Sequence, residues 1–393
     1  MYRIKKTLFF FYKALKHPAN AIKHILPLKR LINNLFQIYG IRYQLPVLDS
    51  IILCVTNFCN AHCLMCDIGL NHDKGMNILQ RSEKREMDFE LLKKISNDPY
   101  VLKHKPFFNI LMTEPLLHSR IGAIVKELKE NNYQVNLTTN GFLLPEKAQE
   151  LAESGLDYLQ VSIDGPIELH NRIRGIDVFR KAIEGIKKLN SFNAKPLINI
   201  NCVITNLNFS YLTKLVDKIE REGILINQFK FQFMYFVSEA MQKRNNVLGV
   251  KEMMQSESTI NKYMMPDKVN IDILYKELQE LRAMKPHNIQ QIRIIPDIRS
   301  KKELRNYFNF KGEKMPYYDY CAWPFRQIAV KTDGVVLFHT RCFNYSLGSL
   351  LDGSCVRSVF FSLKAKYFRK QFKRYKFCLP ACTRCCGVVS KVS

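Results

Sequence analysis

Three cysteines in one short segment are the residues that most clearly suggest chemistry: Cys59, Cys63 and Cys66. Their C-x3-C-x2-C spacing lets a single loop hold three corners of an iron–sulfur cube, which leaves one iron with an open coordination position. A catalytic metal site needs such an open position. The alternative is a zinc site completed by His62 or Cys54, although zinc motifs usually consist of cysteine or histidine pairs. Three metal-free thiols at a strand end would be prone to oxidation.

The run before this loop, residues 49–56, is apolar and rich in β-branched residues, so it predicts a buried strand. This strand, Thr56-Asn57 and the cysteine loop together resemble the radical S-adenosylmethionine (radical SAM) enzymes, whose signature is C-x3-C-x-φ-C after the first barrel strand. Met65 fills the φ position. The resemblance implies a [4Fe-4S] cluster on the three cysteines, with S-adenosylmethionine bound at the open iron.

Strand and helix patterns alternate along the next part of the chain. The predicted strands cover residues 49–56, 107–112, 135–139, 158–163, 197–204 and 229–236. Helical patterns lie between them, and Ser119 is expected to cap one of these helices. This order argues for parallel strands in an α/β fold. The resemblance implies a partial (β/α)6 TIM-like barrel, followed by a small C-terminal iron–sulfur domain made of a β-hairpin and a helix.

Polar residues follow the predicted strands, at the edge where such folds carry out chemistry. The resemblance implies that six of them bind the cofactor: Glu114, Asn140, Ser162, Asp164, Arg174 and Asn201. In this assignment Glu114 binds the methionine amino group and Arg174 lies near the cofactor carboxylate. The resemblance also implies that Ser162 and Asp164 lie near the ribose of the cofactor. No residue is assigned as the catalytic one.

Two further positions bear on this assignment. Asn201, together with Thr205-Asn206, is expected to face the adenine of the cofactor. Met112-Thr113 stands where the family usually has two glycines before the glutamate. The close backbone approach that glycine allows is therefore in question, while the carboxylate is kept.

A second group of cysteines lies near the C-terminus. The order of a cysteine, a hairpin, a helix and a C-x2-C pair resembles the extension called SPASM, or its shorter form, twitch. By this resemblance an auxiliary [4Fe-4S] cluster is held by four cysteines: Cys321, Cys342, Cys382 and Cys385. Cys378, Cys386 or His339 is a candidate replacement for one ligand. A zinc ribbon on the same thiols is the alternative, because sequence separates the two poorly.

The formal net charge of +25 predicts an anionic partner, such as nucleic acid, anionic lipid or a phosphorylated substrate. Residues 1–47 read as a basic amphipathic arm, which either lies on an anionic membrane or packs on the enzyme. No apolar stretch is long enough to span a bilayer. We therefore expect a cytoplasmic protein, which would also be peripheral to the inner face of the membrane if the arm lies on that membrane and is not packed on the enzyme. Nucleic acid is disfavoured, since no RNA-binding module is visible.

The expected domains are the arm (1–47), the radical SAM core (48–240), a linker or insertion (241–290) and the auxiliary cluster domain (291–393). The resemblance implies an oxidoreductase-type enzyme that cleaves S-adenosylmethionine with one electron from a donor such as flavodoxin or ferredoxin. The resulting 5′-deoxyadenosyl radical takes hydrogen from a substrate. The expected substrate is an anionic carbohydrate, phosphorylated or lipid-linked. The alternatives are a peptide-maturing enzyme and a non-catalytic iron–sulfur or zinc scaffold.

Overall fold

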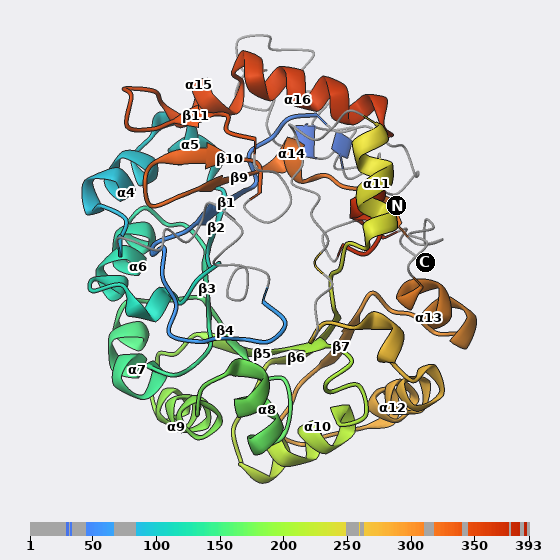
Figure 1. The fold of residues 1–393 in the computed structure, drawn as a ribbon. Coiled ribbons are helices and arrows are strands. Elements are labelled where there is room, and N and C mark those ends of the chain that lie inside the picture. Colours follow the sequence, from blue (N-terminus) through green and yellow to red (C-terminus); the bar gives the residue numbers. More distant parts are fainter. Residues whose placement is uncertain are drawn as a thin grey trace, which may run out of the picture.

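A single curved sheet organises the part of the chain that the structure describes. This computed structural model describes residues 29–30, 32–33, 45–66, 84–248, 259, 263–309, 318–339, 345–376, 379–385 and 389–390. The sheet has ten strands in the order β11-β10-β9-β1-β2-β3-β4-β5-β6-β7. Figure 1 shows it as an arc with most helices on its outer side.

The strands of this sheet are β1 (Ser50–Leu53), β2 (Phe107–Ile110), β3 (Val135–Thr139), β4 (Tyr158–Ser162), β5 (Leu197–Ile204), β6 (Gln228–Phe233), β7 (Ile292–Ile295), β9 (Gln327–Val330), β10 (Val335–Leu337) and β11 (Gly348–Ser349). Strands β1 to β7 run parallel in sequence order. Strand β9 joins the other edge of β1 in parallel, and β10 and β11 follow it antiparallel. The predicted α/β class and partial barrel are confirmed.

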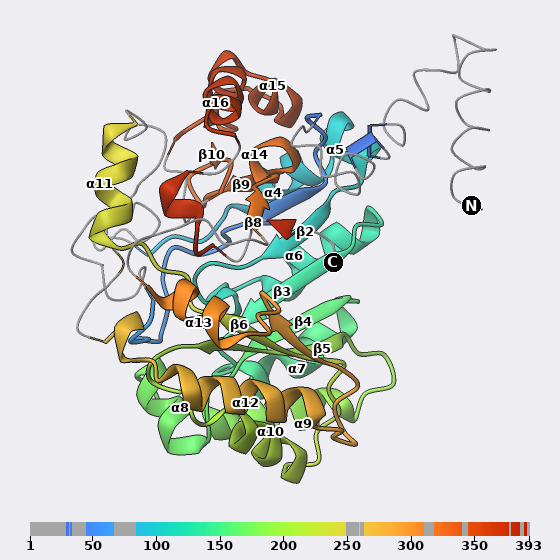
Figure 2. The same ribbon diagram turned by 90° about the vertical axis from the view of Figure 1, so that its right-hand side faces the viewer.

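The helices that cover the parallel strands are α4 (Phe89–Ser96), α5 (Pro99–His104), α6 (Ile121–Glu130), α7 (Leu144–Glu153), α8 (Ile167–Arg174), α9 (Phe179–Asn190), α10 (Leu212–Arg221) and α12 (Ile271–Ala283). The remaining elements are α11 (Glu239–Val247), α13 (Lys301–Phe308), α14 (Trp323–Arg326), α15 (Val356–Phe360), α16 (Leu363–Arg374) and the strand pair β8 (Tyr318–Tyr320) and β12 (Val389–Ser390). Figure 2 shows α15 and α16 beyond the β9–β10 end of the sheet. One sheet thus carries strands from both the predicted core and the predicted auxiliary domain.

The strands alternate between buried and half-buried residues. In β6 the phenylalanines are buried, whereas Gln228, Lys230 and Gln232 between them are half-buried. The same alternation runs through β2 to β5. Since successive side chains of a strand point to opposite faces, the apolar set packs under the helices and the polar set faces the inside of the arc. The inside of this partial barrel is therefore polar and incompletely filled.

Two local predictions can be compared with these elements. The expected cap at Ser119 is wrong: α6 has Arg120 at its N-cap position, without a side-chain cap. Ser119 instead donates to Glu86 from its backbone N–H (2.9 Å) and from its hydroxyl (2.5 Å). Ser119 lies one residue before the N-cap, and its side chain is turned toward the Glu86 carboxylate and not toward the first N–H groups of the helix.

Only a few residues of the predicted N-terminal arm are described. Arg30 donates to the Asp49 carboxylate at 2.6 Å and to the His104 carbonyl at 2.9 Å. Asn33 exchanges two hydrogen bonds with the backbone of Leu45. This part of the arm is thus packed on the barrel, while residues 1–28 lie outside the described residues. Among the described helices, none is both long and apolar enough to cross a bilayer.

Candidate functional site

Cys59, Cys63 and Cys66 follow β1 and line one cavity of about 540 Å³ inside the arc. Cys63 is buried, whereas Cys59 and Cys66 are half-buried. Burial raises the pKa of Cys59 to about 12 and also raises the pKa of Cys63. The protein alone therefore favours the protonated thiols of Cys59 and Cys63, and a cationic metal centre would supply the charge that thiolates need.

The cysteine loop is held by the C-terminal end of α8. The backbone N–H of His62 donates to the Arg174 carbonyl (3.1 Å), and that of Leu64 donates to the Ile173 carbonyl (2.8 Å). Gly175 ends α8 in the left-handed conformation, with φ of 67°. A Cβ atom at this position would lie 2.7 Å from the His62 carbonyl oxygen. Only glycine therefore allows the loop to approach the helix this closely.

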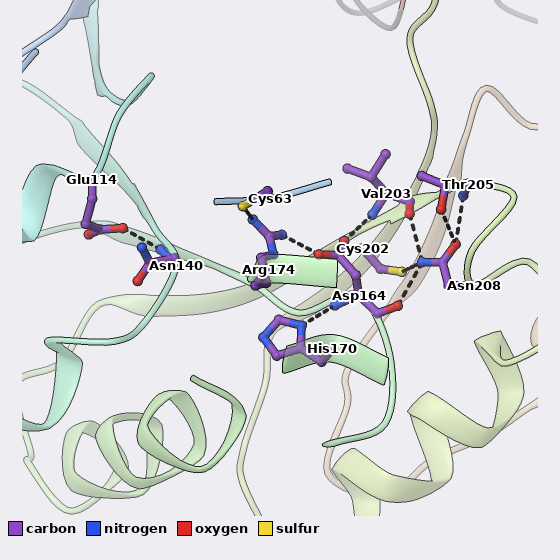
Figure 3. Close-up of polar contacts among 10 residues, drawn as sticks. All are labelled: Cys63, Glu114, Asn140, Asp164, His170, Arg174, Cys202, Val203, Thr205 and Asn208. Atoms are coloured by element: carbon purple, nitrogen blue, oxygen red, sulfur yellow. Dashed lines mark hydrogen bonds and ion pairs between the residues drawn. The ribbon is translucent and has the colours of Figure 1, made fainter. Parts of the chain in front are cut away.

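Arg174 points from this helix end toward Cys63 (Figure 3). Its guanidinium pairs with the Asp164 carboxylate at 2.5 Å and contacts the Cys63 sulfur at 3.8 Å. Burial acts to lower the pKa of Arg174, but Asp164 and Cys63 outweigh it and raise this pKa above its usual value. Arg174 is thus a fixed positive charge beside the most buried of the three thiols.

The Glu114 carboxylate follows β2 and lines the same cavity. It accepts hydrogen bonds from the Thr139 hydroxyl (2.6 Å), the Asn140 backbone N–H (2.7 Å) and the Leu116 backbone N–H (3.1 Å). Burial raises the pKa of Glu114 from 4.5 to about 7, although these hydrogen bonds act to lower it. The Glu114 carboxyl is therefore only partly ionised near neutral pH, and a bound cationic group would favour its ionised form.

Met112, two residues earlier, has φ of 107°, a conformation that favours glycine. The backbone geometry expected of the family's glycine thus persists although the side chain differs. The next residue, Thr113, is fixed by its hydroxyl, which contacts the Thr56 hydroxyl at 2.7 Å and donates to the Thr56 carbonyl at 2.9 Å. The strained segment is therefore anchored to the end of β1.

The other predicted cofactor contacts fall in two groups. Asn140, Ser162 and Asn201 line the cavity. The Asn140 amide donates to the Asn60 side-chain oxygen at 2.8 Å, which ties the end of β3 to the cysteine loop. The side-chain oxygen of Asn201 is buried and has no hydrogen-bond partner among the described residues. A ligand group that donates a hydrogen bond would satisfy it.

Asp164 behaves differently, because it is fully buried and does not line the cavity. Its carboxylate holds Arg174 and accepts the Val203 backbone N–H at 2.9 Å. Its backbone N–H donates to the imidazole of His170, whose pKa burial lowers well below the usual value. Asp164 therefore positions Arg174 from beneath, and the structure does not bring it to the cavity where a ribose would lie.

A second network braces the end of β5 (Figure 3). The Asn208 amide donates to the carbonyls of Asp164 (2.8 Å) and Val203 (2.9 Å). Its side-chain oxygen accepts the Thr205 backbone N–H at 2.7 Å. Asn206, also expected near the adenine, accepts the backbone N–H of Met265 at 3.0 Å. Thr205 is therefore bonded within its own turn and Asn206 to the backbone of Met265, and neither lines the cavity.

The second cysteine group reaches the same cavity through Cys385. Cys321, Cys382 and Cys385 are buried, and Cys385 lines the cavity. Cys342 and the candidate replacements Cys378 and Cys386 lie outside the described residues. His339 lines the cavity, where its ring stacks on Trp323 with centroids 4.2 Å apart.

Arg384, between Cys382 and Cys385, holds this turn in place. It is fully buried, and its guanidinium donates to the carbonyls of Tyr307 (2.5 Å), Asn306 (2.6 Å) and Thr383 (2.8 Å). The sequence did not predict this anchor, because an arginine between cysteines reads as a surface charge.

The three loop cysteines and Arg174 line the same cavity, and the chemistry of these thiols suits an iron–sulfur cluster. Among the described residues, no three histidine, cysteine or carboxylate side chains converge closely enough to hold one metal ion. The thiolates of an iron–sulfur cube bind different irons at separate corners, so they need not converge on one point. Three cysteines on one cavity wall, beside a fixed arginine, meet that requirement.

Sequence reasoning also missed the residues that form the inner wall of the cavity. Gln160, Lys230 and Gln232 line it from β4 and β6, and Trp323 and Gln327 line it from α14 and β9. Two of these residues, Lys230 and Gln232, could have been predicted from the alternating pattern of β6, Gln-Phe-Lys-Phe-Gln-Phe. Trp323 and Gln327 carry no comparable signal, because their place depends on β9 joining β1.

Comparisons with known proteins agree with this geometry. Residues 53–219 match the Radical SAM superfamily. A Thermococcus kodakarensis protein named probable GTP 3′,8-cyclase is 25% identical over 63% of this chain and 79% of its own length. A Saccharolobus islandicus protein of the same name is 29% identical over 45% of this chain. The chain spans about half the length of that second relative, 54%.

Solved structures share the fold. Streptococcus suis SuiB bound to S-adenosylmethionine has a TM-score of 0.59 at 15% identity, over 94% of this chain and 77% of SuiB. The protein anSMEcpe with bound AdoMet has a TM-score of 0.54 at 18% identity, over 81% of this chain and 82% of its own. The chain therefore carries a radical SAM domain over residues 53–219, inside the wider fold that these crystal structures share.

Proposed function

We propose that this radical SAM enzyme takes a hydrogen atom from a polar, carbohydrate-type substrate held inside the barrel. A radical SAM domain implies a [4Fe-4S] cluster and S-adenosylmethionine, and together they supply a 5′-deoxyadenosyl radical that abstracts hydrogen. One observation carries the proposal: the three loop cysteines, the Glu114 carboxylate and a row of inward amides line a single cavity.

The cofactor end of the cavity offers complementary groups. Cys59, Cys63 and Cys66 would hold the cluster. The Glu114 carboxylate would accept the ammonium group of the cofactor, because its own bonds to Thr139 and Asn140 fix its orientation. The unpartnered oxygen of Asn201 would accept a further donor. Burial of these groups excludes water from the reacting atoms.

The substrate end of the cavity suits a polyhydroxylated molecule. The amides of Asn109, Gln160 and Gln232 present donors and acceptors, which match hydroxyl groups. The flat face of the Trp323–His339 stack offers a platform for a sugar ring. Lys230 adds a cation to this wall, which suits a phosphate or carboxylate on the substrate.

The position of Cys385 favours a net oxidation. Cys385 lines this cavity, so an auxiliary cluster bound there would supply an electron acceptor close to the substrate. The twelve cysteines of the chain are consistent with a second cluster. A small electron carrier such as flavodoxin or ferredoxin is the proposed source of the first electron.

Two other substrate classes remain candidates. Relatives named probable GTP 3′,8-cyclase suggest a purine nucleotide, which the Trp323–His339 stack and Lys230 would also suit. SuiB has also been solved with its precursor peptide SuiA, which keeps the peptide-maturing alternative in view. The row of amides favours the carbohydrate, since hydroxyl groups need many hydrogen bonds within a small volume.

Turnover with candidate substrates tests the proposal. Reconstituted and reduced protein would be mixed with S-adenosylmethionine and, separately, nucleotide-activated or phosphorylated sugars, GTP and peptides. We expect sugars to increase 5′-deoxyadenosine formation. Trp323→Ala and Gln160→Leu should reduce that increase about tenfold or more and leave the basal rate, because each removes one substrate contact. Stimulation by GTP or peptide alone would contradict the carbohydrate assignment.

Matched variants distinguish the loss of a substrate contact from a loss of the folded structure. Trp323→Phe keeps an aromatic face and should retain most of the stimulation. Gln149→Leu removes an exposed amide of α7 and should change nothing.

A further inference from the structure

The outward side of α16 combines basic and apolar residues on one continuous face. Its inward side is made of Ala365, Phe368, Arg369 and Phe372, which are buried. The exposed residues follow helical spacing along the opposite side: Leu363, Lys366, Tyr367, Lys370 and Arg374. We call these five residues the α16 face. Spacings of three, four and seven residues bring all of them to the same side of the helix.

Two members of the α16 face are apolar or aromatic and yet exposed. Leu363 is 82% exposed and Tyr367 is 53% exposed. Lone exposed apolar residues are ordinary, but here they alternate with cations along one helix. This combination is typical of helices that lie in the interface of an anionic bilayer, where apolar groups enter and cations meet headgroups.

The charges on this face do not serve the stability of the helix. Lys366, Lys370 and Arg374 are spaced four residues apart, so they repel one another. Lys364 stands near the N-terminus of α16, where the helix dipole disfavours cations. Among the residues that the structure describes, Lys366, Lys370 and Arg374 have no carboxylate partner. From Arg357 to Lys391 the sequence holds ten basic residues and no acidic one.

The helix is rigidly joined to the wall of the cavity. The buried Arg369 guanidinium donates to the Pro324 carbonyl (2.7 Å) and to the Phe360 carbonyl (2.8 Å). Pro324 belongs to α14, whose Trp323 lines the cavity. Figures 1 and 2 both place α16 outside the β9–β10 end of the sheet, away from the arc interior. A surface bound to α16 would therefore leave the cavity uncovered.

We propose that the α16 face binds the surface of an anionic lipid bilayer. Charge complementarity selects an anionic partner, and exposed Leu363 and Tyr367 favour a bilayer over a nucleic acid, which has no apolar layer to receive them. The chain's own residues 1–28 are a poor partner, since they contain six basic residues and no acidic one. The proposal is independent of the substrate and of the chemistry in the cavity.

Sedimentation of the full-length protein with lipid vesicles tests this proposal. The vesicles contain phosphatidylcholine alone or mixed with phosphatidylglycerol, at low and high salt. We expect binding to the anionic vesicles only. Neutralising Lys366, Lys370 and Arg374 to glutamine should weaken it about 100-fold at low salt, because each charge near such a surface is worth about fivefold.

A second variant tests the apolar part of the face. Leu363→Ser with Tyr367→Ser should weaken binding about tenfold, including at high salt, where charge is screened. A control with Lys126, Lys195 and Lys276 changed to glutamine loses the same charge from other exposed sites and should bind nearly as wild type. Thermal unfolding verifies that each variant is folded. Wild-type binding by the α16 triple variant, or binding to duplex RNA but not to anionic vesicles, would overturn the proposal.

Discussion

The two cysteine regions of this chain are held in opposite ways. The loop with Cys59, Cys63 and Cys66 lies at the cavity surface and is fixed mainly by backbone hydrogen bonds to the end of α8. The turn with Cys382 and Cys385 is buried, and a single arginine inside it binds three backbone carbonyls. Among the described residues, all three loop cysteines line the cavity, whereas Cys385 alone of the turn cysteines does so.

This difference matches the distinction between open and closed metal sites. A site that must bind a substrate keeps a coordination position free, whereas a structural or electron-transfer site is saturated by protein ligands. Both regions reach the same cavity, since Cys385 and the three loop cysteines all line it. We therefore expect the loop to react with the cofactor and the turn to support it.

The largest expected effect comes from removing each cysteine set in turn. Changing Cys59, Cys63 and Cys66 to alanine should abolish cofactor cleavage and remove about four irons, while a second cluster of about four irons remains. Changing Cys382 and Cys385 should leave the first cluster. Iron analysis of reconstituted protein measures both. Loss of all iron from the first variant would contradict two separate sites.

Arg384→Met is the next largest change. It leaves buried carbonyls of Asn306 and Tyr307 without donors, and we expect a loss of about 3 kcal/mol or more in the free energy of unfolding. Urea unfolding and iron content would report it, with the iron lost from the C-terminal turn first. Arg299→Met is the control, because this side chain is 77% exposed and its ion pair with Asp297 should be worth less than about 1 kcal/mol.

Gly175→Ala should disturb the open region selectively. The new Cβ would meet the His62 carbonyl, so the cysteine loop must move away from α8. We expect about tenfold slower formation of 5′-deoxyadenosine, because the reacting groups shift from their aligned positions. Gly223→Ala is a matched control: it has nearly the same φ, 69°, but no atom near the added Cβ. Equal effects of both variants would mean that backbone strain alone is responsible.

Titration of Glu114 gives a smaller effect with a defined direction. Its pKa is raised to about 7 in the folded protein. Protonation of Glu114 therefore stabilises the folded state at low pH, and this stabilisation is lost as the pH rises through 7. Binding of the cofactor ammonium needs the ionised form. Affinity for S-adenosylmethionine should therefore rise about tenfold between pH 6 and pH 8, measured by calorimetry. Glu114→Gln should bind weakly at both values; a tenfold rise in that variant would assign the titration to another group.

Met112→Gly should have the smallest effect. The residue holds φ of 107°, which costs a non-glycine residue about 1–3 kcal/mol. Glycine relieves this strain, but its greater conformational entropy stabilises the unfolded chain and offsets part of the gain. We expect a net stabilisation of about 1 kcal/mol in urea unfolding, with the cavity unchanged. A clear loss of stability would show that packing of the methionine side chain outweighs its backbone strain.

Much of the fold could be predicted from the sequence because its strands are strongly patterned. The bounds of β3 and β5 agree with the predicted ranges, and β6 differs by a few residues. Strand β7 was missed, since its four residues have no alternation and pair only with β6. The addition of β9 beside β1 was also missed, because it joins residues more than 270 apart in sequence.

The site was predictable only where a motif carried it. The loop cysteines and Glu114 were found by their spacing and their place after strands, and the structure brings them to one cavity. Asp164 could not be separated from Ser162 by sequence, because burial beneath Arg174 is a property of three-dimensional packing. Trp323 and Arg384 had no pattern, since their roles arise from contacts with distant carbonyls and rings.

Cofactor cleavage by the loop region is the most direct test of the account. Anaerobically reconstituted protein would be reduced with dithionite and mixed with S-adenosylmethionine, and 5′-deoxyadenosine would be measured beside iron content. We expect product from the wild type and from Cys382→Ala/Cys385→Ala, and none from Cys63→Ala. An iron-replete wild type that forms no 5′-deoxyadenosine would contradict the assignment of the open region as the reacting centre.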